Sequence, residues 1–327
     1  MGLAFYKPTP PPFAKGADIG WLSEMEAAGV PFYDNDGTAK DCLQILKDHG
    51  INSIRLRVWV NPASNWCGKD DVVAMAKRAA GMGFRIMIDF HYSDSWADPG
   101  KQNKPAAWAG HDFHQLLDDV SQHTTDVLSA LKDAGVTPEW VQVGNEVRPG
   151  MLWPDGSTKN WPQLAQLLNQ GYDAVKAVFP DTQVVIHLDH GDDNRMFRDW
   201  FDTAAKNGVK YDVIGMSLYP GKTNWPGVSD KCLANLNDMA SRYGKEVMIC
   251  EIGMDHEAED AAHEMLTKMI KGLESVPDGK GLGIFYWEPE SYNTPKGNWG
   301  HYGKGAWTDD GKPSHAMDAF KEDSTGQ

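Results

Sequence analysis

Two glutamates draw attention because each follows a short apolar run of the kind that forms a buried strand. Glu146 closes the stretch Val143-Gly144-Asn145-Glu146, and Glu251 follows Ile249-Cys250. A carboxylate in such surroundings is costly unless it is paired or used in chemistry. Cleavage of a glycosidic bond needs two carboxyl groups that flank it, ~5–5.5 Å apart when the anomeric configuration is retained. The alternative is a structural ion pair between each glutamate and a nearby arginine.

Two such carboxyls must play different parts in the reaction, but physical principles alone do not say which residue plays which part. Two close carboxylates do not both ionise cheaply, so one is expected to stay protonated and to donate to the leaving oxygen. The other then attacks the anomeric carbon. Esterification removes its charge, so the pKa of the first group falls and that group becomes the base that activates water.

Further candidate site residues stand where predicted strands end. Arg55 and Arg57 are two residues apart and therefore share one face of a strand. At least one of these arginines is expected to keep a catalytic carboxylate ionised. The alternative is that they form a purely structural ion pair in the interior. Other predicted strand ends carry further candidate binding residues: His91, His187, Asp189, Tyr219 and Trp287. For His91, His187, Tyr219 and Trp287, a plain packing role is the alternative.

Two other acidic residues and one group of metal-binding residue types are alternative candidates for a catalytic or metal-binding role. Asp89 lies inside a predicted strand, and we interpret it as structural. Glu288 follows Trp287, so if Trp287 faces the interior, the alternation of strand side chains turns Glu288 away. His91, Asp94 and Asp98 are metal-binding residue types, but their spacing matches no known metal motif. We therefore expect no metal ion and no cofactor.

The elements that must position these residues follow from the hydrophobic pattern. Short β-rich runs alternate with longer helical patterns, which predicts a parallel sheet with crossover helices. The clearest helix spans 112–133, where apolar residues recur at the 3.6-residue period until Gly135 ends it. The predicted strands span 16–19, 53–60, 85–90, 140–143, 184–188, 213–218, 247–251 and 283–287. The other predicted helices span 41–49, 70–81, 161–178, 194–207, 230–243, 257–272 and 314–321.

Eight strands, each followed by a helix, predict an α/β fold: a single (β/α)8 TIM barrel over residues 16–321. Residues 1–15 are interpreted as a proline-rich lead-in and 322–327 as a polar tail. Active sites of such barrels lie at the carboxyl ends of the strands, where both glutamates are expected. No glycine-rich phosphate turn follows the first strand, which disfavours a doubly wound nucleotide-binding sheet.

Composition narrows the class of ligand. The formal net charge of −15 argues against nucleic acid and anionic membranes as partners, because both repel an acidic protein. A neutral ligand fits better. Several of the 13 tryptophans, Trp299 among them, lie in loops rich in Gly, Pro and Asn, where they either cap the core or stack on sugar rings. No apolar run is long enough to span a membrane, and residues 1–6 carry no signal-peptide pattern.

The four cysteines include no C-x-x-C pair, which argues against a metal site. In an exported protein they can form two disulfides, whereas in a cytosolic one they are expected to be buried thiols. Chain order suggests Cys42–Cys67 and Cys232–Cys250 among the three possible pairings.

Several segments resemble the endo-β-1,4-galactanases of glycoside hydrolase family 53, which belong to a larger clan of barrel glycosidases. They run in order along nearly the whole chain, and the stretches 55–62 and 91–99 are more specific to the galactanases than the clan-wide Asn-Glu pair. The segments are Gly16-Ala17-Asp18-Ile19, Arg55-Leu56-Arg57-Val58-Trp59-Val60-Asn61-Pro62, His91-Tyr92-Ser93-Asp94-Ser95-Trp96-Ala97-Asp98-Pro99, Gly144-Asn145-Glu146, Ile186-His187-Leu188-Asp189, Ser217-Leu218-Tyr219-Pro220 and Cys250-Glu251-Ile252-Gly253.

The resemblance implies a role for individual residues. Glu146 would be the acid/base and Glu251 the nucleophile. Asn145 would hydrogen-bond the sugar 2-hydroxyl, and Tyr219 would contact the nucleophile. The aromatic and polar lining of the sugar subsites would come from Trp287, Trp96 and Asp94. His190 departs from the amide-type residue expected there, which leaves the contacts of that loop open.

The activity implied is endo-acting, retaining hydrolysis of β-1,4-galactosidic bonds in galactan and type I arabinogalactan, the side chains of pectin. The enzyme is expected to be secreted and monomeric. Bacterial relatives can carry a structural calcium ion after the seventh strand, but the segment 254–260 is short and we expect no ion there. Two alternatives remain: a related barrel glycanase acting on xylan, mannan or cellulose, and a non-catalytic carbohydrate-binding barrel, which would normally lack one of the two glutamates.

Overall fold

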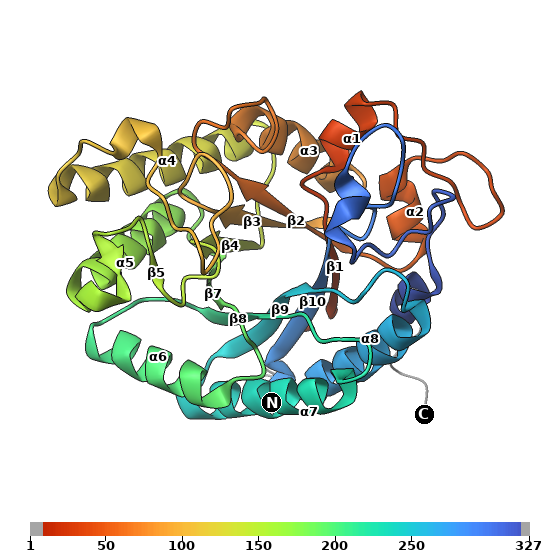
Figure 1. The fold of residues 1–327 in the computed structure, drawn as a ribbon. Helices are drawn as coiled ribbons and strands as arrows, with labels where there is room; N and C mark the ends of the chain where they lie inside the picture. The colour runs from red at the N-terminus through yellow and green to blue at the C-terminus, as the bar shows by residue number, and fades with distance from the viewer. Residues whose placement is uncertain (1–8, 322–327) are drawn as a thin grey trace, which may run out of the picture.

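Eight parallel strands close into a barrel in the computed structural model, which describes residues 9–321. The strands follow one another around the barrel in the order β1-β10-β9-β8-β7-β4-β3-β2. Helices surround them (Figure 1), so the predicted α/β barrel is confirmed. The strand bounds are β1 Ala14–Asp18, β2 Ser53–Val58, β3 Arg85–Phe90, β4 Trp140–Val143, β7 Gln183–Leu188, β8 Val213–Leu218, β9 Glu246–Ile252 and β10 Gly281–Trp287.

The outer helices begin where local chemistry favours a helix start. Asp112 caps the longest helix in a capping box with Gln115, and Pro226 stands in the first turn of α7. That proline starts α7 five residues before the predicted residue 230. The bounds are α1 Leu22–Ala27, α2 Cys42–Asp48, α3 Lys69–Gly81, α4 Phe113–Asp133, α5 Trp161–Val178, α6 Asn194–Lys206, α7 Trp225–Tyr243 and α8 Glu259–Glu274.

A few elements differ from the sequence-based prediction. The barrel begins at Ala14, two residues inside the expected lead-in, because Ala14 pairs with Gly283 of β10. The last predicted helix is a 3₁₀ helix, His315–Phe320. Helix α1 and the hairpin of β5 (Gly150–Met151) with β6 (Gly156–Ser157) were not predicted, since both are too short to show a period. The expected tail 322–327 and residues 1–8 of the lead-in lie outside the described residues.

The barrel wall divides the apolar core into two parts. The larger part fills the space between the strands and the helices. The smaller part fills the lumen at the amino ends of the strands and consists of Ala14, Met87, Trp140, Val185, Val213, Met248, Cys250 and Phe285. Because side chains alternate across a strand, the next lumen-facing positions toward the carboxyl ends are available for polar groups.

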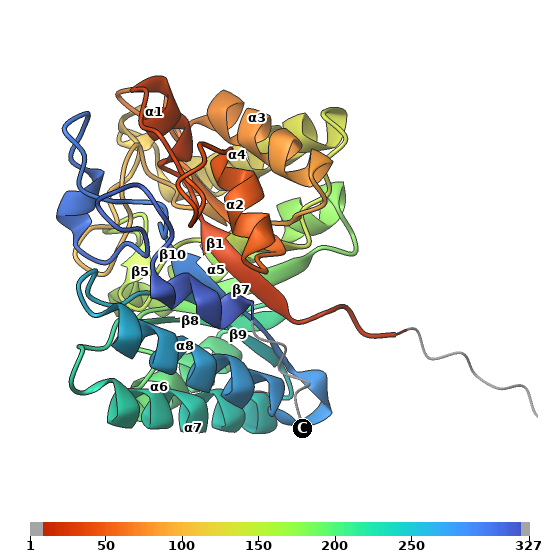
Figure 2. The ribbon, with the colours of Figure 1, turned by 90° about the vertical axis from the view of Figure 1, so that its right-hand side faces the viewer.

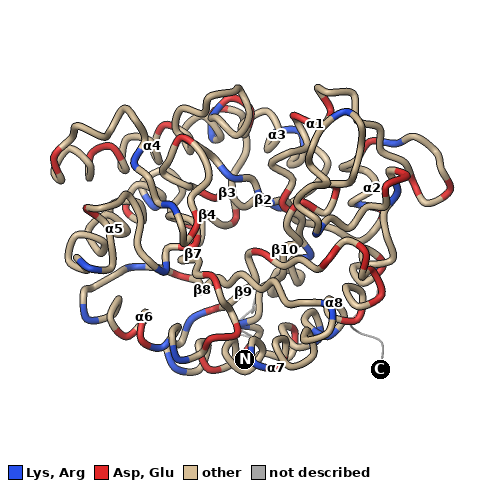
Figure 3. Tube along the Cα trace, viewed as in Figure 1, with Lys and Arg blue, Asp and Glu red and all other residues tan. Residues whose placement is uncertain are grey.

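Long loops gather at the carboxyl ends of the strands, at the opposite end of the barrel from the amino-terminal segment (Figure 2). On the outside, Lys and Arg positions are interspersed with Asp and Glu positions around the ring of helices (Figure 3). Among the described residues, no helix has the length and apolarity needed to cross a bilayer.

The suggested disulfides are not formed, and all four cysteines are buried free thiols. Cys232 lies on α7 in the core outside the barrel, whereas Cys250 lies in the lumen, so the strand wall separates them. Cys42 begins α2, whereas the thiol of Cys67 faces the backbone oxygen of Gly20 at 3.7 Å. Nearness along the chain was therefore a poor guide to pairing: the barrel wall separates Cys232 from Cys250, and Cys42 and Cys67 are both free.

Candidate active site

A β-bulge in β9 directs Glu251 into the barrel. Gly215 of β8 pairs with Met248, and Ser217 pairs with Glu251, so β9 contains one residue more than β8 between these two pairings. The same extra residue shifts the pairing of β9 with β10. Without it, strict alternation from the lumen-facing Met248 would turn Glu251 toward the helices.

Glu146 is held in a backbone conformation that is uncommon for a glutamate. Its φ is +46°, and Gly144 two residues earlier has a φ of +82°. A Cβ on Gly144 would lie 2.5 Å from a methyl group of Val147, so a glycine is required there. A non-glycine residue in the left-handed region is a form of local strain that is common at functional sites.

Glu251 is nearly buried and is held by two donors. Arg55 donates from Nη1 at 3.0 Å, and the Tyr219 hydroxyl donates at 2.6 Å. Burial raises the pKa of Glu251, and the Arg55 guanidinium and the Tyr219 hydroxyl oppose that rise. This carboxyl is therefore the better stabilised as an anion.

Among residues 9–321, no Lys or Arg side chain forms an ion pair with Glu146, although the charge of Arg55 acts on it from a distance. The Ser217 hydroxyl donates to its Oε2 at 3.0 Å. Burial raises the pKa of Glu146 well above its ordinary value, and the charges of Glu251 and Asp189 raise it further. The two carboxyls thus have the unequal environments that keep one protonated while the other is ionised.

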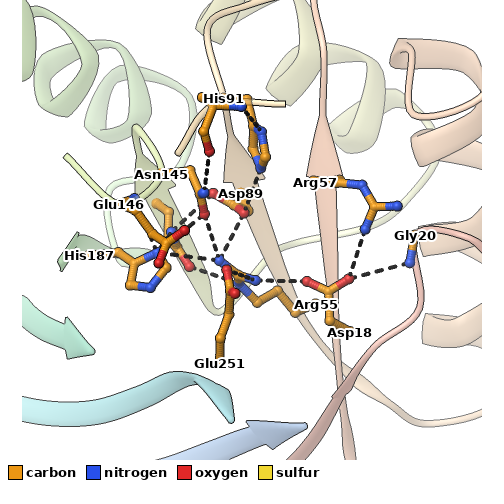
Figure 4. A network of polar contacts seen from close by, with 12 residues as sticks. Asp18, Gly20, Arg55, Arg57, Asp89, His91, Asn145, Glu146, His187 and Glu251 are labelled. Carbon is orange, nitrogen blue, oxygen red and sulfur yellow. Dashed lines mark hydrogen bonds and ion pairs between the residues drawn. The ribbon is translucent and has the colours of Figure 1, made fainter. Parts of the chain in front are cut away.

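The guanidinium of Arg55 lies at the centre of the polar layer (Figure 4). It contacts side chains from four other strands or their ends, and its own exposed fraction is 0%. The contacts are Asp18 of β1 at 2.8 Å, Asp89 of β3 at 2.8 Å, Gln142 of β4 at 2.8 Å, Asn145 at 3.0 Å and Glu251 of β9 at 3.0 Å.

His187 supports the Glu146 side of this layer. Its Nδ1 accepts from Gln142 Nε2 at 3.0 Å and from the Glu146 backbone amide at 3.4 Å, so the proton is on Nε2. Nε2 then donates to the Ser217 hydroxyl at 2.6 Å, which itself donates to Glu146. Burial lowers the pKa of His187 well below its ordinary value, which keeps the ring neutral.

Both glutamates open into one cleft of about 560 Å³. Aromatic rings form much of its wall: Trp21, Trp96, Trp287 and Tyr302 make edge or tilted contacts with centroid separations of 4.7 to 6.1 Å. Tyr219 is a further aromatic in this wall. The remaining lining residues are His91, Ala97, Asp98, Asn145, Asn298 and His301. Such a combination of flat apolar faces and convergent polar groups suits a sugar chain.

The candidate site residues divide into three groups. The cleft brings together Glu146, Glu251, His91, Trp96, Asn145, Tyr219 and Trp287. Arg55 and His187 lie directly behind the two glutamates. The other four candidates do not line the cleft. They are Arg57, Asp94, Asp189 and Trp299, and each of them contacts a residue outside the cleft lining.

Those four residues have supporting positions. Arg57 pairs with Glu288 at 2.6 Å. Asp94 accepts from two loop amides at 2.9 Å, and Asp189 pairs with Arg148 at 2.7 Å. Trp299 donates to Glu24 at 3.3 Å and lines a neighbouring hollow. For Arg57 and Asp189, a position on or just after a strand did not show which way the side chain turns.

Several residues of the site were missed by sequence reasoning. Asp18 and Gln142 contact Arg55, and Ser217 contacts Glu146. Their signal was a polar residue at a lumen-facing strand position, which the pattern of β1, β4 and β8 contains. Trp21 and Tyr302 come from loops without any period, so no pattern indicated them.

The residues considered for a metal are engaged otherwise. His91 accepts at Nδ1 from the Ala97 amide and donates from Nε2 to Asp89 at 3.2 Å. Asp98 accepts from the Gly100 amide at 2.8 Å. Among residues 9–321, no group of His, Cys, Asp and Glu side chains is arranged to hold a metal ion.

A parallel barrel that holds two carboxyls in one cleft at the carboxyl ends of its strands defines the class of barrel glycoside hydrolases. The model of glycosyl hydrolase family 53 matches residues 14–265. The chain belongs to this family.

Comparisons with individual proteins agree with this family assignment. An arabinogalactan endo-beta-1,4-galactanase of Thermothelomyces thermophilus is 33% identical over 297 residues, which cover 84% of this chain and 89% of the relative. An uncharacterized protein in the bgaB 5'region of Niallia circulans is 37% identical over 308 residues, 85% of this chain and 83% of the relative. The Ignisphaera aggregans GH53 catalytic domain superposes with a TM-score of 0.88 at 30% identity, covering 96% of this chain and 97% of that domain.

Proposed function

We propose that this family 53 hydrolase cleaves β-1,4-galactosidic bonds within galactan chains and retains the anomeric configuration. The observation that carries the proposal is the unequal environment of the two carboxyls in one cleft. Glu251 is paired with Arg55, whereas Glu146 is half-buried and forms no ion pair with a described Lys or Arg side chain. Relatives whose names state β-1,4-galactanase activity support galactan as the substrate.

In the first step, protonated Glu146 donates to the glycosidic oxygen while the Glu251 carboxylate attacks the anomeric carbon. The bond between that carbon and the oxygen breaks, and an ester to Glu251 forms. Arg55 and Tyr219 lie where they hold the attacking carboxylate in place. Esterification removes the negative charge that raised the pKa of Glu146, so Glu146 stays ionised after giving up its proton.

In the second step, ionised Glu146 takes a proton from water, whose oxygen attacks the anomeric carbon. The ester bond to Glu251 breaks, the sugar leaves with its original configuration, and both carboxyls return to their starting states. The neutral His187–Ser217 pair orients Glu146 in both steps through the hydrogen bond to Oε2. Because galactan is a polymer outside the cell, we also propose that the enzyme works there.

A panel of neutral polysaccharides tests the substrate. We expect new reducing ends from galactan and none from xylan, mannan or cellulose, and NMR of the first product should show the β-anomer. Activity only on another polymer would reject galactan, and binding without cleavage would favour a carbohydrate-binding role.

The same assay tests the two roles. Glu251→Ala should lose turnover by at least ~10⁴-fold, and azide should then give an α-galactosyl azide, because the small anion attacks from the face that the carboxylate left. Glu146→Ala should lose roughly 10²–10⁴-fold on galactan, with less loss on substrates that have good leaving groups. Formation of the α-azide by the Glu146 variant instead would reverse the assignment.

A further inference from the structure

Two buried glutamates outside the proposed reaction lie together just after β10. The exposed fractions of Glu288 and Glu290 are both 0%. Glu288 accepts from Arg57 at 2.6 Å and from the Trp21 amide at 3.2 Å. Among the described residues, no donor of good geometry reaches either carboxyl oxygen of Glu290, whose side chain meets the carboxyl of Glu288.

The charges around this pair do not balance a second anion. Arg57 is the cation in contact, and it already pairs with Glu288 and, at 3.4 Å, with Asp18 of β1. Arg55, the next guanidinium, is engaged by Asp18, Asp89 and Glu251. An ionised Glu290 would therefore be a third carboxylate beside one guanidinium without a donor of its own, which is a costly arrangement.

Among the described residues, the other titratable groups that interact with the pair bring no further positive charge. Cys42 of α2 interacts with Glu290, and Cys67 of the loop after β2 interacts with Glu288. Burial raises the pKa of Cys42, and it raises that of Cys67 to about 11, so both thiols are neutral near neutral pH. A proton on Glu290 resolves the mismatch, because it makes this residue a donor and removes its charge.

We propose that Glu290 is a neutral carboxylic acid that donates its proton in a hydrogen bond to Glu288, and that this pair positions the aromatic wall of the cleft. Glu288 holds the Trp21 backbone on one side and Arg57 on the other. The Arg57 guanidinium carbon lies 4.3 Å from the ring centroid of Trp96 and 5.4 Å from that of Trp287. Glu290 is thus a positioning residue that acts through Glu288.

The pair also has a defined pH dependence. Burial raises the pKa of Glu290 well above its ordinary value, and the neighbouring charge of Glu288 raises it further. A group whose pKa is raised by folding stabilises the protein fully below its unfolded pKa, and that contribution is lost as the pH rises through the folded pKa. The protein should therefore lose stability on the alkaline side because of Glu290.

Thermal unfolding of wild type and Glu290→Gln between about pH 5 and about pH 9 tests this directly. The amide of the variant still donates to Glu288 but does not ionise. The Tm of wild type minus that of Glu290→Gln should fall by roughly 3 °C or more as the pH rises. The matched control is Glu264→Gln at an exposed position of α8, where the difference should stay flat. An infrared difference spectrum should show a protonated carboxyl band that Glu290→Gln lacks.

The effect on the cleft rests on the proposed function and is read from galactan hydrolysis. Glu290→Leu removes the donor, so we expect KM to rise roughly tenfold with a smaller change in kcat, while Glu290→Gln restores KM to within about threefold. If galactan is not cleaved at all, the proposed function fails, but unfolding and infrared still decide the state of Glu290. A Tm difference that is flat or rises with pH, or a missing carboxyl band, would overturn the proposal.

Discussion

At the scale of single residues, the surroundings of Glu146 shift its pKa in opposite directions. Burial and the charges of Glu251 and Asp189 favour the protonated form, whereas the Ser217 hydroxyl donates to Oε2 and favours the ionised form. A general acid loses activity as the pH rises through its pKa. In the proposed mechanism, the alkaline limb of the rate profile therefore reports the pKa of Glu146.

This predicts shifts of opposite sign from two neighbours. Ser217→Ala removes a donor to the carboxylate, so the alkaline limb of kcat/KM should move to higher pH by roughly half a unit or more. Asp189→Asn removes a negative charge and should move the same limb to lower pH. The profile on galactan, measured for both variants and wild type, checks the prediction. Shifts in the same direction for both would show that another group controls this limb.

At the scale of elements, the bulge in β9 depends on a glycine in the neighbouring strand. A Cβ built on Gly215 of β8 would lie 2.4 Å from Cys250 Sγ and 2.9 Å from a methyl group of Val185. Cys250 is the residue before Glu251, inside the bulged stretch. The absence of a side chain at residue 215 therefore leaves room for the turn of the chain that directs Glu251 inward.

Gly215→Ala should consequently affect both stability and catalysis. We expect a loss of about 1–3 kcal/mol in the free energy of unfolding from overpacking, and at least a tenfold loss in kcat because Glu251 is displaced. Adding Cys250→Ala removes the clashing sulfur and should recover more than half of both losses. Urea unfolding and initial rates of the four proteins in the cycle measure this. Strictly additive losses would mean that the two sites are not coupled.

At the scale of the whole molecule, Arg55 joins opposite sides of the barrel. It stands on β2 and contacts β1, β3, β4 and β9 within one buried layer. Above the apolar lumen, this polar layer takes the place of apolar side chains, and Asp18, Asp89 and Glu251 all pair with Arg55 within it. The active site and the closure of the barrel are therefore linked through one side chain.

Arg55→Met should lower the free energy of unfolding by about 3–5 kcal/mol, because Asp18, Asp89 and Glu251 lose their shared counterion. The matched control is Arg78→Met, which breaks partly exposed pairs with Glu26 and Asp41 and should cost about 0–1 kcal/mol. Urea unfolding of both variants measures the difference. Equal losses for the two arginines would contradict a central role for Arg55.

The amino-acid sequence by itself determined the barrel and the strand ends at which both glutamates stand. Strands β3, β4 and β8 agree with their predicted bounds, since continuous apolar runs between turn signals are local features. Polar residues inside or just after such runs are visible in the same way, which is why Arg55, His187 and Tyr219 were predicted.

Only the tertiary structure decided which way those side chains turn and what they meet. The bulge that directs Glu251 inward is a register shift between two strands, so no pattern within β9 reveals it. Glu288, which was expected to turn away if Trp287 faces the interior, does not line the cleft, and its partner Arg57 could not be read from the sequence. Trp21, the free cysteines and the neutral Glu290 likewise depend on contacts between distant segments, and such contacts exist only once the barrel has closed.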